Sequence, residues 1–271
     1  MKNLNIILSI FIFCLFSFQT SAQLDYKYEP LPCLNKKVTV LIHYVRGGFD
    51  DPDDDDITKE DILNQIDSLN NYFEPICLSF EVCGFDTITN WQYNELESQA
   101  EWNDMQVKYH KANRLNIFFV RETHLPNACG FANLEGVQNL ESGGIVIKKE
   151  CILGNDSKTV PHEVGHFFGL LHTFEGNGIE LVDGSNCLTE GDKLCDTPSD
   201  PFVNGDPVED YVDVGLGCRF ISNKVDANGE YYRPDVGNIM SYYPDQCGCG
   251  FTHQQYLKMA KTYQESLSKI W

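Results

Sequence analysis

The chain has 271 residues, of which 42% are hydrophobic, and its 40 acidic and 20 basic side chains give a formal net charge of −20. This length is enough for one large domain, or two subdomains, with a buried core. A surface this acidic repels the phosphates of nucleic acids, so we expect no nucleic-acid partner.

Residues 1–22 have the features of a secretory signal peptide. Lys2 precedes an apolar run, and the small residues at 20–22 are typical of a signal-peptidase site. The residues before Cys14 are too large for a lipoprotein cleavage site, and no other apolar run is long enough to cross a bilayer. We therefore expect a monomeric protein without a membrane anchor, secreted outside the cell or, in a bacterium, into the periplasm.

The predicted elements alternate between strand and helix in the first part of the chain. Apolar and alternating patterns predict strands at 37–46, 76–83, 114–122, 129–136 and 143–151, with 129–136 polar enough for a sheet edge. Helical spacing predicts helices at 58–75, with Thr58 as the N-cap, and at 96–110. Before them lie a short N-terminal segment, 23–36, and between the first strand and helix an acidic turn, 49–57.

The TVPHEVGHFFGLLHTFEG stretch that follows carries a metal-binding pattern. On a helix His162 and His166 lie side by side and can chelate one ion, with Glu163 beside it. A continuous helix would turn His172 away, but Gly169 accepts a left-handed backbone that ends the helix and returns His172 to the ion. Three neutral imidazoles leave one zinc position open for water, as in catalytic sites. We therefore expect Zn²⁺ on the three histidines and Glu163 as the catalytic base.

The chain after residue 173 is rich in Gly, Pro, Asp and Cys, and has little periodicity until a final amphipathic helix at 252–270. Ten cysteines remain without Cys14, and an even number in an exported chain favours disulfides over free thiols. Five of them fall in this region, where one scheme pairs Cys187 with Cys195 and Cys218 with Cys247, although other pairings remain open. The element order predicts an α+β fold with a catalytic subdomain, 37–172, and an irregular C-terminal subdomain, 173–271.

The complete pattern H-E-x-x-H-x-x-G-x-x-H resembles that of the metzincins, zinc proteases with a later methionine turn. Four blocks more closely resemble the pappalysin family: HEVGHFFGLLHTF (162–174), GDKLCDTP (191–198), NIMSY (238–242) and CGCGFTHQQ (247–255). They cover the C-terminal half in the family's order, whereas the N-terminal half matches only in its sequence of strands and helices. The resemblance implies a metzincin-like zincin fold, with a twisted mixed sheet, a zinc helix and a disulfide-linked C-terminal subdomain.

The resemblance also implies roles for residues after the zinc motif. Met240 would form an apolar floor beneath the zinc, although the family often has Asn-Tyr-Met-Asp-Tyr where this chain has NIMSY. Tyr242 would stabilise the oxyanion of the tetrahedral intermediate. In similar relatives an acidic residue at the position of Asp245 selects Arg or Lys after the scissile bond, and an ordinary turn aspartate is the alternative.

The block GDKLCDTP carries a second implied cofactor, a calcium ion. Its oxygen ligands would be Asp192, Asp196 and Thr197, and the ion would stiffen a loop that lacks secondary structure. A surface turn without an ion is the alternative for the same three residues.

The sequence thus predicts a secreted zinc endopeptidase, in which an extended protein or peptide substrate adds as a strand to the edge at 129–136. The peptide substrate follows from the resemblance, because zinc-activated water hydrolyses other acyl groups too. One alternative is a zinc hydrolase of a non-peptide ester or amide. The other is a zinc-stabilised extracellular binding module without catalysis, and Glu163 argues against it because a silent site needs no base.

Overall fold

A computed structural model of the protein describes residues 29–48, 57–139, 143–153 and 157–266. The predicted signal peptide, nearly all of the acidic turn and the end of the last predicted helix lie outside the described residues. Among the residues that are described, no helix is both long enough and apolar enough to span a lipid bilayer.

A five-stranded sheet, ordered β2-β1-β3-β5-β4, is the frame of the N-terminal half. Its strands are β1 (Lys36–Arg46), β2 (Leu78–Thr89), β3 (Leu115–Val120), β4 (Gly130–Ala132) and β5 (Gly144–Lys148). Four of them run parallel, and β4 alone pairs antiparallel with β5. The predicted mixed sheet is therefore confirmed, and β4 is its predicted edge strand.

Helices cover both faces of this sheet. They are α2 (Lys59–Phe73), α3 (Trp91–Asn94), α4 (Gln99–Tyr109), α5 (Thr159–Phe167) and α6 (His253–Glu265). Thr58 caps α2 as predicted, because its hydroxyl accepts from the Asp61 N–H while the Asp61 carboxylate accepts from the Thr58 N–H. Short 3-10 helices join the elements: η2 (Glu74–Ile76), η3 (Gly136–Gln138), η4 (Lys149–Ile152), η5 (Val208–Asp210) and η6 (Asp245–Cys247).

The alternation of side chains along β3 divides the core into two clusters. Ile117 and Phe119 pack with α2, α5 and α6 on one face, whereas Phe118 and Val120 pack with α3 and α4 on the other. Every residue of β3 is buried, as expected for a central parallel strand, and its one polar residue, Asn116, is hydrogen-bonded to His43 and to the carbonyl of Lys111. The zinc-motif helix α5 is thus embedded in the larger cluster.

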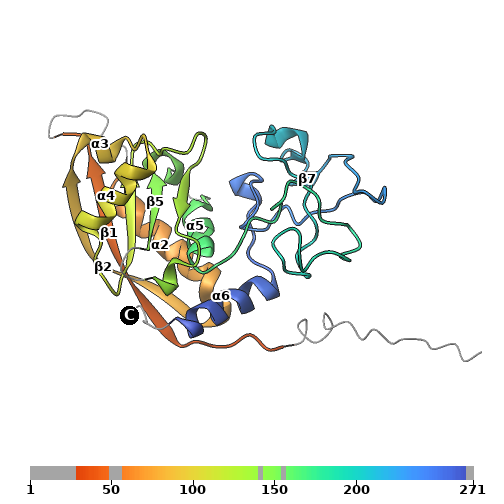
Figure 1. Ribbon diagram of the computed structural model, residues 1–271, viewed down its shortest axis with the longest axis horizontal. Helices are drawn as coiled ribbons and strands as arrows, with labels where there is room; N and C mark the ends of the chain where they lie inside the picture. The colour runs from red at the N-terminus through yellow and green to blue at the C-terminus, as the bar shows by residue number, and fades with distance from the viewer. Residues whose placement is uncertain (1–28, 49–56, 140–142, 154–156, 267–271) are drawn as a thin grey trace, which may run out of the picture.

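The segment between α5 and α6 contains little regular structure, as its composition predicts. It forms a lobe of loops beside the sheet, from which α6 runs back toward α2 (Figure 1). Its only described strands are the two-residue pair β6 (Val212–Asp213) and β7 (Arg219–Phe220). A third, smaller core cluster, which includes Phe174, Phe202 and Tyr243, lies inside the lobe.

Four disulfides join eight of the cysteines: Cys33–Cys77, Cys129–Cys151, Cys187–Cys195 and Cys218–Cys247. The predicted pairing in the C-terminal lobe is confirmed. Cys83 and Cys249, however, are exposed free thiols, so the expectation that the even count means pairing is wrong for these two. Cys83 lies on the exposed part of β2. The neighbouring cysteine of Cys249, Cys247, is already bonded to Cys218.

Candidate active site

Helix α5 brings two histidines and the predicted base into the interior of the protein. Val160, Val164 and Phe167 are fully buried on the side that packs into the core. The polar face is almost equally buried, with His162 7% and Glu163 5% exposed. A polar side chain is rarely buried to this extent unless it has a ligand or a partner.

The helix ends in a left-handed turn at Gly169, whose φ is +92°. The Gly169 N–H donates to the His166 carbonyl at 2.8 Å, and the Leu170 N–H donates to the Gly165 carbonyl at 3.0 Å. These two bonds are the Schellman motif, which requires a residue without a Cβ penalty at this position. The bend turns the chain so that His172 faces the helix again.

The three histidines converge as the spacing predicts. Among the described residues, His162, His166 and His172 form the one group of three or more possible ligands whose atoms lie within 4.8 Å of one another. Nδ1–H of His162 donates to the Ile239 carbonyl at 2.8 Å, and Nδ1–H of His166 donates to the Leu170 carbonyl at 2.7 Å. These bonds leave Nε2 unprotonated in each neutral ring and directed toward the shared space.

The electrostatics of the triad suit a metal cation. Nε2 of His166 lies 3.0 Å from Nε2 of His172, an arrangement that leaves a lone pair facing the neighbouring ring. Burial first, and then repulsion from His172, lowers the pKa of His166 to about 4, and burial lowers the pKa of His162 well below its usual value. Both rings are therefore neutral at pH 7, which is the form that binds zinc.

Glu163 has the properties of a carboxylate whose partner comes from outside the protein. Burial raises its pKa to about 8, and its Oε2 atom is buried without a hydrogen-bond partner among the described residues. Strand β4 passes directly beside it, because a Cβ added to Gly130 would lie 3.1 Å from Oε1 of Glu163. The carboxylate therefore lies between the three imidazoles and the edge of the sheet.

Met240 and Tyr242 of the later turn lie next to α5 and the histidines. Met240 is fully buried, and its Sδ fills the space where a Cβ on Gly165 would stand, at 2.5 Å. The ring of Tyr242 lies 4.8 Å from that of His172 and is 37% exposed. Burial, followed by the nearby charge of Glu163, raises the pKa of Tyr242 to about 12, so the phenol is a neutral donor at pH 7.

Comparison with known proteins agrees with this geometry. The family model described as pregnancy-associated plasma protein-A, a peptidase family, matches residues 99–264. The chain belongs to this family, the pappalysins. It is accordingly a metalloendopeptidase, and the metal that such a site takes is zinc.

Individual relatives are more distant. An extracellular metalloprotease of Verticillium alfalfae is 26% identical over 73% of this chain and 66% of its own length. Another, from Arthroderma benhamiae, is 26% identical over 85% of this chain and 73% of its own. The solved structure of Tannerella forsythia mature mirolysin in complex with a cleaved peptide matches with a TM-score of 0.58 and 19% identity, over 82% of this chain and 89% of that one. This likeness supports the metzincin-like fold.

Asp245 begins η6, three residues after Tyr242 in this pappalysin, and its side chain is exposed. Its negative charge faces the ammonium of Lys158, whose pKa the carboxylate acts to raise. The predicted specificity residue thus lies beside the site, but with a cation of the protein already near it.

The predicted calcium ligands are neighbours, because the side chain of Asp192 hydrogen-bonds to that of Thr197 and its charge interacts with that of Asp196. Asp196 accepts from Thr252 Oγ1 at 2.9 Å and from the Gln254 N–H at 2.8 Å, so its carboxylate caps the start of α6. Asp192 is buried and accepts from Gln255 Nε2 at 3.1 Å. Asp196 and Thr197 also line a cavity of about 210 Å³, whereas Asp192 does not. The three residues therefore lie together at the edge of this cavity.

Three charged residues near the site or the cavity escaped the sequence analysis: the exposed Glu175 and the buried Lys158 and Glu180. Glu175 Oε2 lies 3.7 Å from Nδ1 of His172, and Lys158 donates to the turn that holds Met240. Glu180, only 4% exposed, lines the 210 Å³ cavity, and burial raises its pKa to about 8. Of the three, only Glu175 could have been noticed from the sequence, because it stands three residues after the metal ligand His172.

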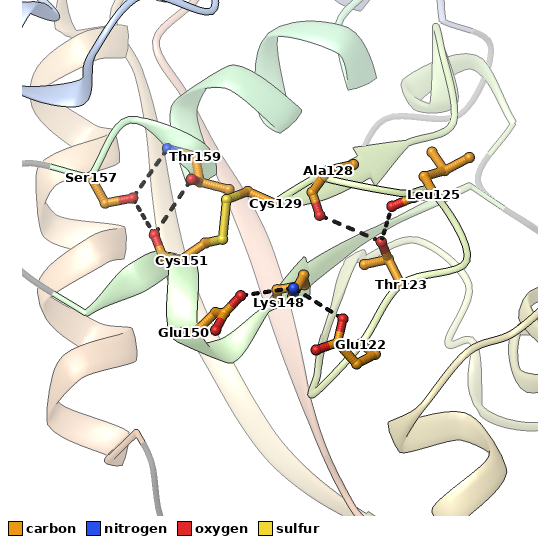
Figure 2. The surroundings of a disulfide bond; sticks show 10 residues. All are labelled: Glu122, Thr123, Leu125, Ala128, Cys129, Lys148, Glu150, Cys151, Ser157 and Thr159. Carbon is orange, nitrogen blue, oxygen red and sulfur yellow. Dashed lines mark hydrogen bonds and ion pairs between the residues drawn. A yellow bond between two sulfur atoms is a disulfide. The ribbon is translucent and has the colours of Figure 1, made fainter. Parts of the chain in front are cut away.

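The Cys129–Cys151 disulfide connects the edge strand with the start of the zinc helix (Figure 2). Cys129 immediately precedes β4, and the Cys151 carbonyl accepts from Ser157 Oγ at 2.7 Å and from Thr159 Oγ1 at 3.5 Å. Thr159 is the first residue of α5, one turn before Glu163. The disulfide therefore helps to fix the position of β4, the strand beside Glu163, relative to α5, the helix that carries Glu163.

Replacing Cys129 and Cys151 by serine is expected to raise KM for a peptide substrate about tenfold, because substrate binding must then order a loosened β4. The loss should also lower the free energy of unfolding by about 3 kcal/mol, as for other loops of this length. Steady-state kinetics and urea unfolding measure the two effects.

The matched control is the Cys33→Ser, Cys77→Ser double variant, which removes a disulfide that lies next to β1 and β2. It should lose similar stability with KM within about twofold of the original value. An equal rise of KM in both variants would mean that the disulfide near β4 has no special effect on substrate binding.

Proposed function

We propose that this pappalysin is a secreted zinc endopeptidase that cleaves proteins or peptides, with Glu163 as the general base. The observation that carries the proposal is a buried carboxylate, with an unpartnered oxygen, next to three convergent imidazoles. The relatives named extracellular metalloproteases, together with the signal-peptide pattern of the first 22 residues, support secretion.

The metal would be held by Nε2 of His162, His166 and His172. When bound, zinc supplies a Lewis acid that lowers the pKa of water toward about 7 and polarises the scissile carbonyl. Glu163 accepts the proton of the attacking water and then carries it to the leaving amine. The zinc charge favours the carboxylate form of Glu163, in opposition to the effect of burial.

The substrate would bind in an extended conformation along β4. Within the described sheet this strand pairs with β5 alone and forms the edge, which is the position at which an extended peptide can add as a further strand. Such a peptide passes Glu163, because Gly130 of β4 is in contact with that side chain. The phenol of Tyr242 then donates a hydrogen bond to the oxyanion that forms at the attacked carbonyl.

Glu163→Gln keeps the shape of the side chain but removes the base. We expect kcat/KM for a peptide to fall about 10²- to 10⁴-fold, while zinc content measured by mass spectrometry stays at one ion per chain. Glu265→Gln, on the exposed part of α6, serves as the control and should be unchanged. Peptide cleavage that persists in a zinc-loaded Glu163→Gln protein would remove Glu163 from the mechanism, and a wild-type protein that cleaves no peptide would favour the two non-protease alternatives.

For specificity, we propose that Asp245 binds the side chain that follows the scissile bond and selects Arg or Lys. A carboxylate beside a pocket forms a charge-assisted pair with a guanidinium. The exposure of Asp245 in η6, close to Tyr242 in sequence, supports this role.

Cleavage of a mixed peptide library should therefore give products that begin with Arg or Lys. Asp245→Asn is expected to reduce the preference for Arg over Leu at this position about tenfold, since a charged partner is replaced by a neutral one. Asp210→Asn in η5 is the control. If the native enzyme selects aliphatic residues after the cut, Asp245 has no such function.

We also propose a calcium ion at the 210 Å³ cavity, bound by the predicted ligands Asp192, Asp196 and Thr197 and, in addition, by Glu180. Glu180 supports the site because its carboxyl is buried and is close to the negative charges of Asp192, Asp200 and Glu190. Burial also raises the pKa of Asp192 to about 7. Such carboxyls repel one another unless a hard cation is present, and calcium prefers oxygen ligands.

The calcium effect should depend on pH with a definite sign. Raised pKa values mean that Glu180 and Asp192 stabilise the calcium-free fold below their unfolded pKa of about 4, and that this stabilisation is lost as the pH rises toward about 8. Calcium competes with those protons, so the rise in Tm on adding calcium to the zinc-loaded protein should grow from about pH 5 to about pH 8. Glu180→Gln should reduce the rise and Glu209→Gln should not; no rise with calcium at about pH 8 would contradict the site.

A further inference from the structure

Three consecutive carbonyls of the methionine turn, at 239–241, each accept a hydrogen bond from a different part of the chain. Nδ1–H of His162 donates to the first at 2.8 Å, and the Thr173 N–H donates to the second at 3.2 Å. The ammonium of Lys158 donates to the third at 2.9 Å. The next residue is Tyr242, so these bonds fix the backbone from which its phenol extends.

Lys158 is an unusual residue in such a position because it is almost completely buried, at 5% exposure. It stands immediately before α5, and its carbonyl accepts from the His162 N–H in the first turn of that helix. Its side chain runs under η6, where a Cβ on Gly248 would lie 3.6 Å from its Cδ. Burial of an ammonium is costly unless partners compensate, so its presence needs a reason.

The partners of the ammonium all belong to the turn and its supports. Besides the Ser241 carbonyl, Ser241 Oγ lies 3.4 Å from Nζ, and the carboxylates of Asp245 and Asp200 face it. Asp200 accepts from Tyr243 Oη at 2.6 Å, on the far side of Tyr242 in sequence. Burial lowers the pKa of Lys158 to about 8, against these two carboxylates, so the side chain is still mostly a cation at pH 7.

We propose that Lys158 is a positioning residue for Tyr242. Through the Ser241 carbonyl it fixes the peptide unit between Ser241 and Tyr242, and thus the place of the phenol above the imidazoles. A charged donor makes a stronger and more directional bond than water or a neutral amide would, so the turn does not shift when the oxyanion forms. The inference rests on the proposed function of Tyr242 as oxyanion donor.

A purely structural role predicts something different. Lys158 would then stabilise the fold in the same way as Lys149, another buried lysine, at 2% exposure, whose Nζ lies 3.2 Å from Asn94 Oδ1 and over the ring of Tyr44. Its loss would lower stability and zinc content without any dependence on the phenol of Tyr242. A double-mutant cycle distinguishes the two roles.

The cycle uses the full, zinc-loaded chain and a fluorogenic peptide, with Lys158→Met, Tyr242→Phe and the double variant, and Lys149→Met as the control. Tyr242→Phe should lower kcat about 100-fold, as for the loss of one oxyanion donor, and Lys158→Met about tenfold or more. The double variant should fall less than about threefold below Tyr242→Phe, because an absent phenol cannot be misplaced. KM and zinc affinity should stay within about twofold. Lys149→Met should leave kcat unchanged, and Tyr242→Phe should lower kcat by the same factor in the Lys149→Met protein as in the native protein.

If Tyr242→Phe lowers kcat and the losses from Lys158→Met and Tyr242→Phe multiply in the double variant, the proposed role of Lys158 is overturned. The proposed function is then left intact. A Tyr242→Phe variant with unchanged kcat would overturn both. If Lys158→Met does not fold, Lys158→Arg and Lys158→Gln complete the cycle. Arg, which keeps a charged donor, should retain kcat within about threefold, while Gln should lose activity only where the phenol is present.

Discussion

The close approach of Nε2 of His166 to Nε2 of His172, 3.0 Å apart, is the arrangement on which the rest of the structure depends. The neutral ring of His166 directs a lone pair at its neighbour, and this orientation is imposed by bonds on the other side of the histidine rings. The Leu170 carbonyl imposes it on His166, and it is available only because the chain reverses at Gly169. The Ile239 carbonyl does the same for His162 from far along the chain. The zinc site is therefore complete only when the methionine turn has closed against α5.

This dependence explains why a lobe with so little regular structure must be firmly held. Its loops carry the turn, yet the lobe has only one small core cluster, which the side chains of Phe174 and Tyr243 join. Disulfides replace the missing core, and Cys218–Cys247 connects the short β6–β7 hairpin region with the segment just after the turn. Helix α6 then ties the end of the lobe to the same core as α5. The lobe is rigid where the histidines require it and irregular elsewhere.

Much of the site could be predicted from the sequence because its signals are local. The reversal at Gly169 and the return of His172 follow from helix geometry alone, as does the cap at Thr58. The pairing of Cys187 with Cys195 was one of several that the sequence left open, and the free thiols of Cys83 and Cys249 could not be foreseen, because disulfide partners are set by tertiary placement. Strand β2 continues to Thr89, beyond its predicted end at residue 83, because pairing with β1 holds a stretch that is half exposed and has no apolar pattern.

The residues that the sequence did not reveal are charged side chains whose meaning comes from burial. Lysine before a helix and glutamate in a loop are ordinary surface residues, and nothing in the local pattern marks Lys158 or Glu180 as different. Only the fold encloses them, and enclosure changes the chemistry that each can perform. This is also why local motifs describe how the enzyme hydrolyses a bond better than they describe which bond it selects.

In the proposed selection of a basic side chain, the substrate and Lys158 compete for the carboxylate of Asp245. The carboxylate of Asp245 already interacts with the buried ammonium of Lys158 before any substrate arrives. A guanidinium that enters beside Asp245 therefore meets a charge that is partly compensated, and the gain from the new pair is smaller than an isolated carboxylate would give. The same lysine that holds Tyr242 in place would thus moderate the preference for basic residues. In the function that we propose, substrate selection and the position of Tyr242 are linked through one buried cation, because Lys158 faces Asp245 and bonds the Ser241 carbonyl.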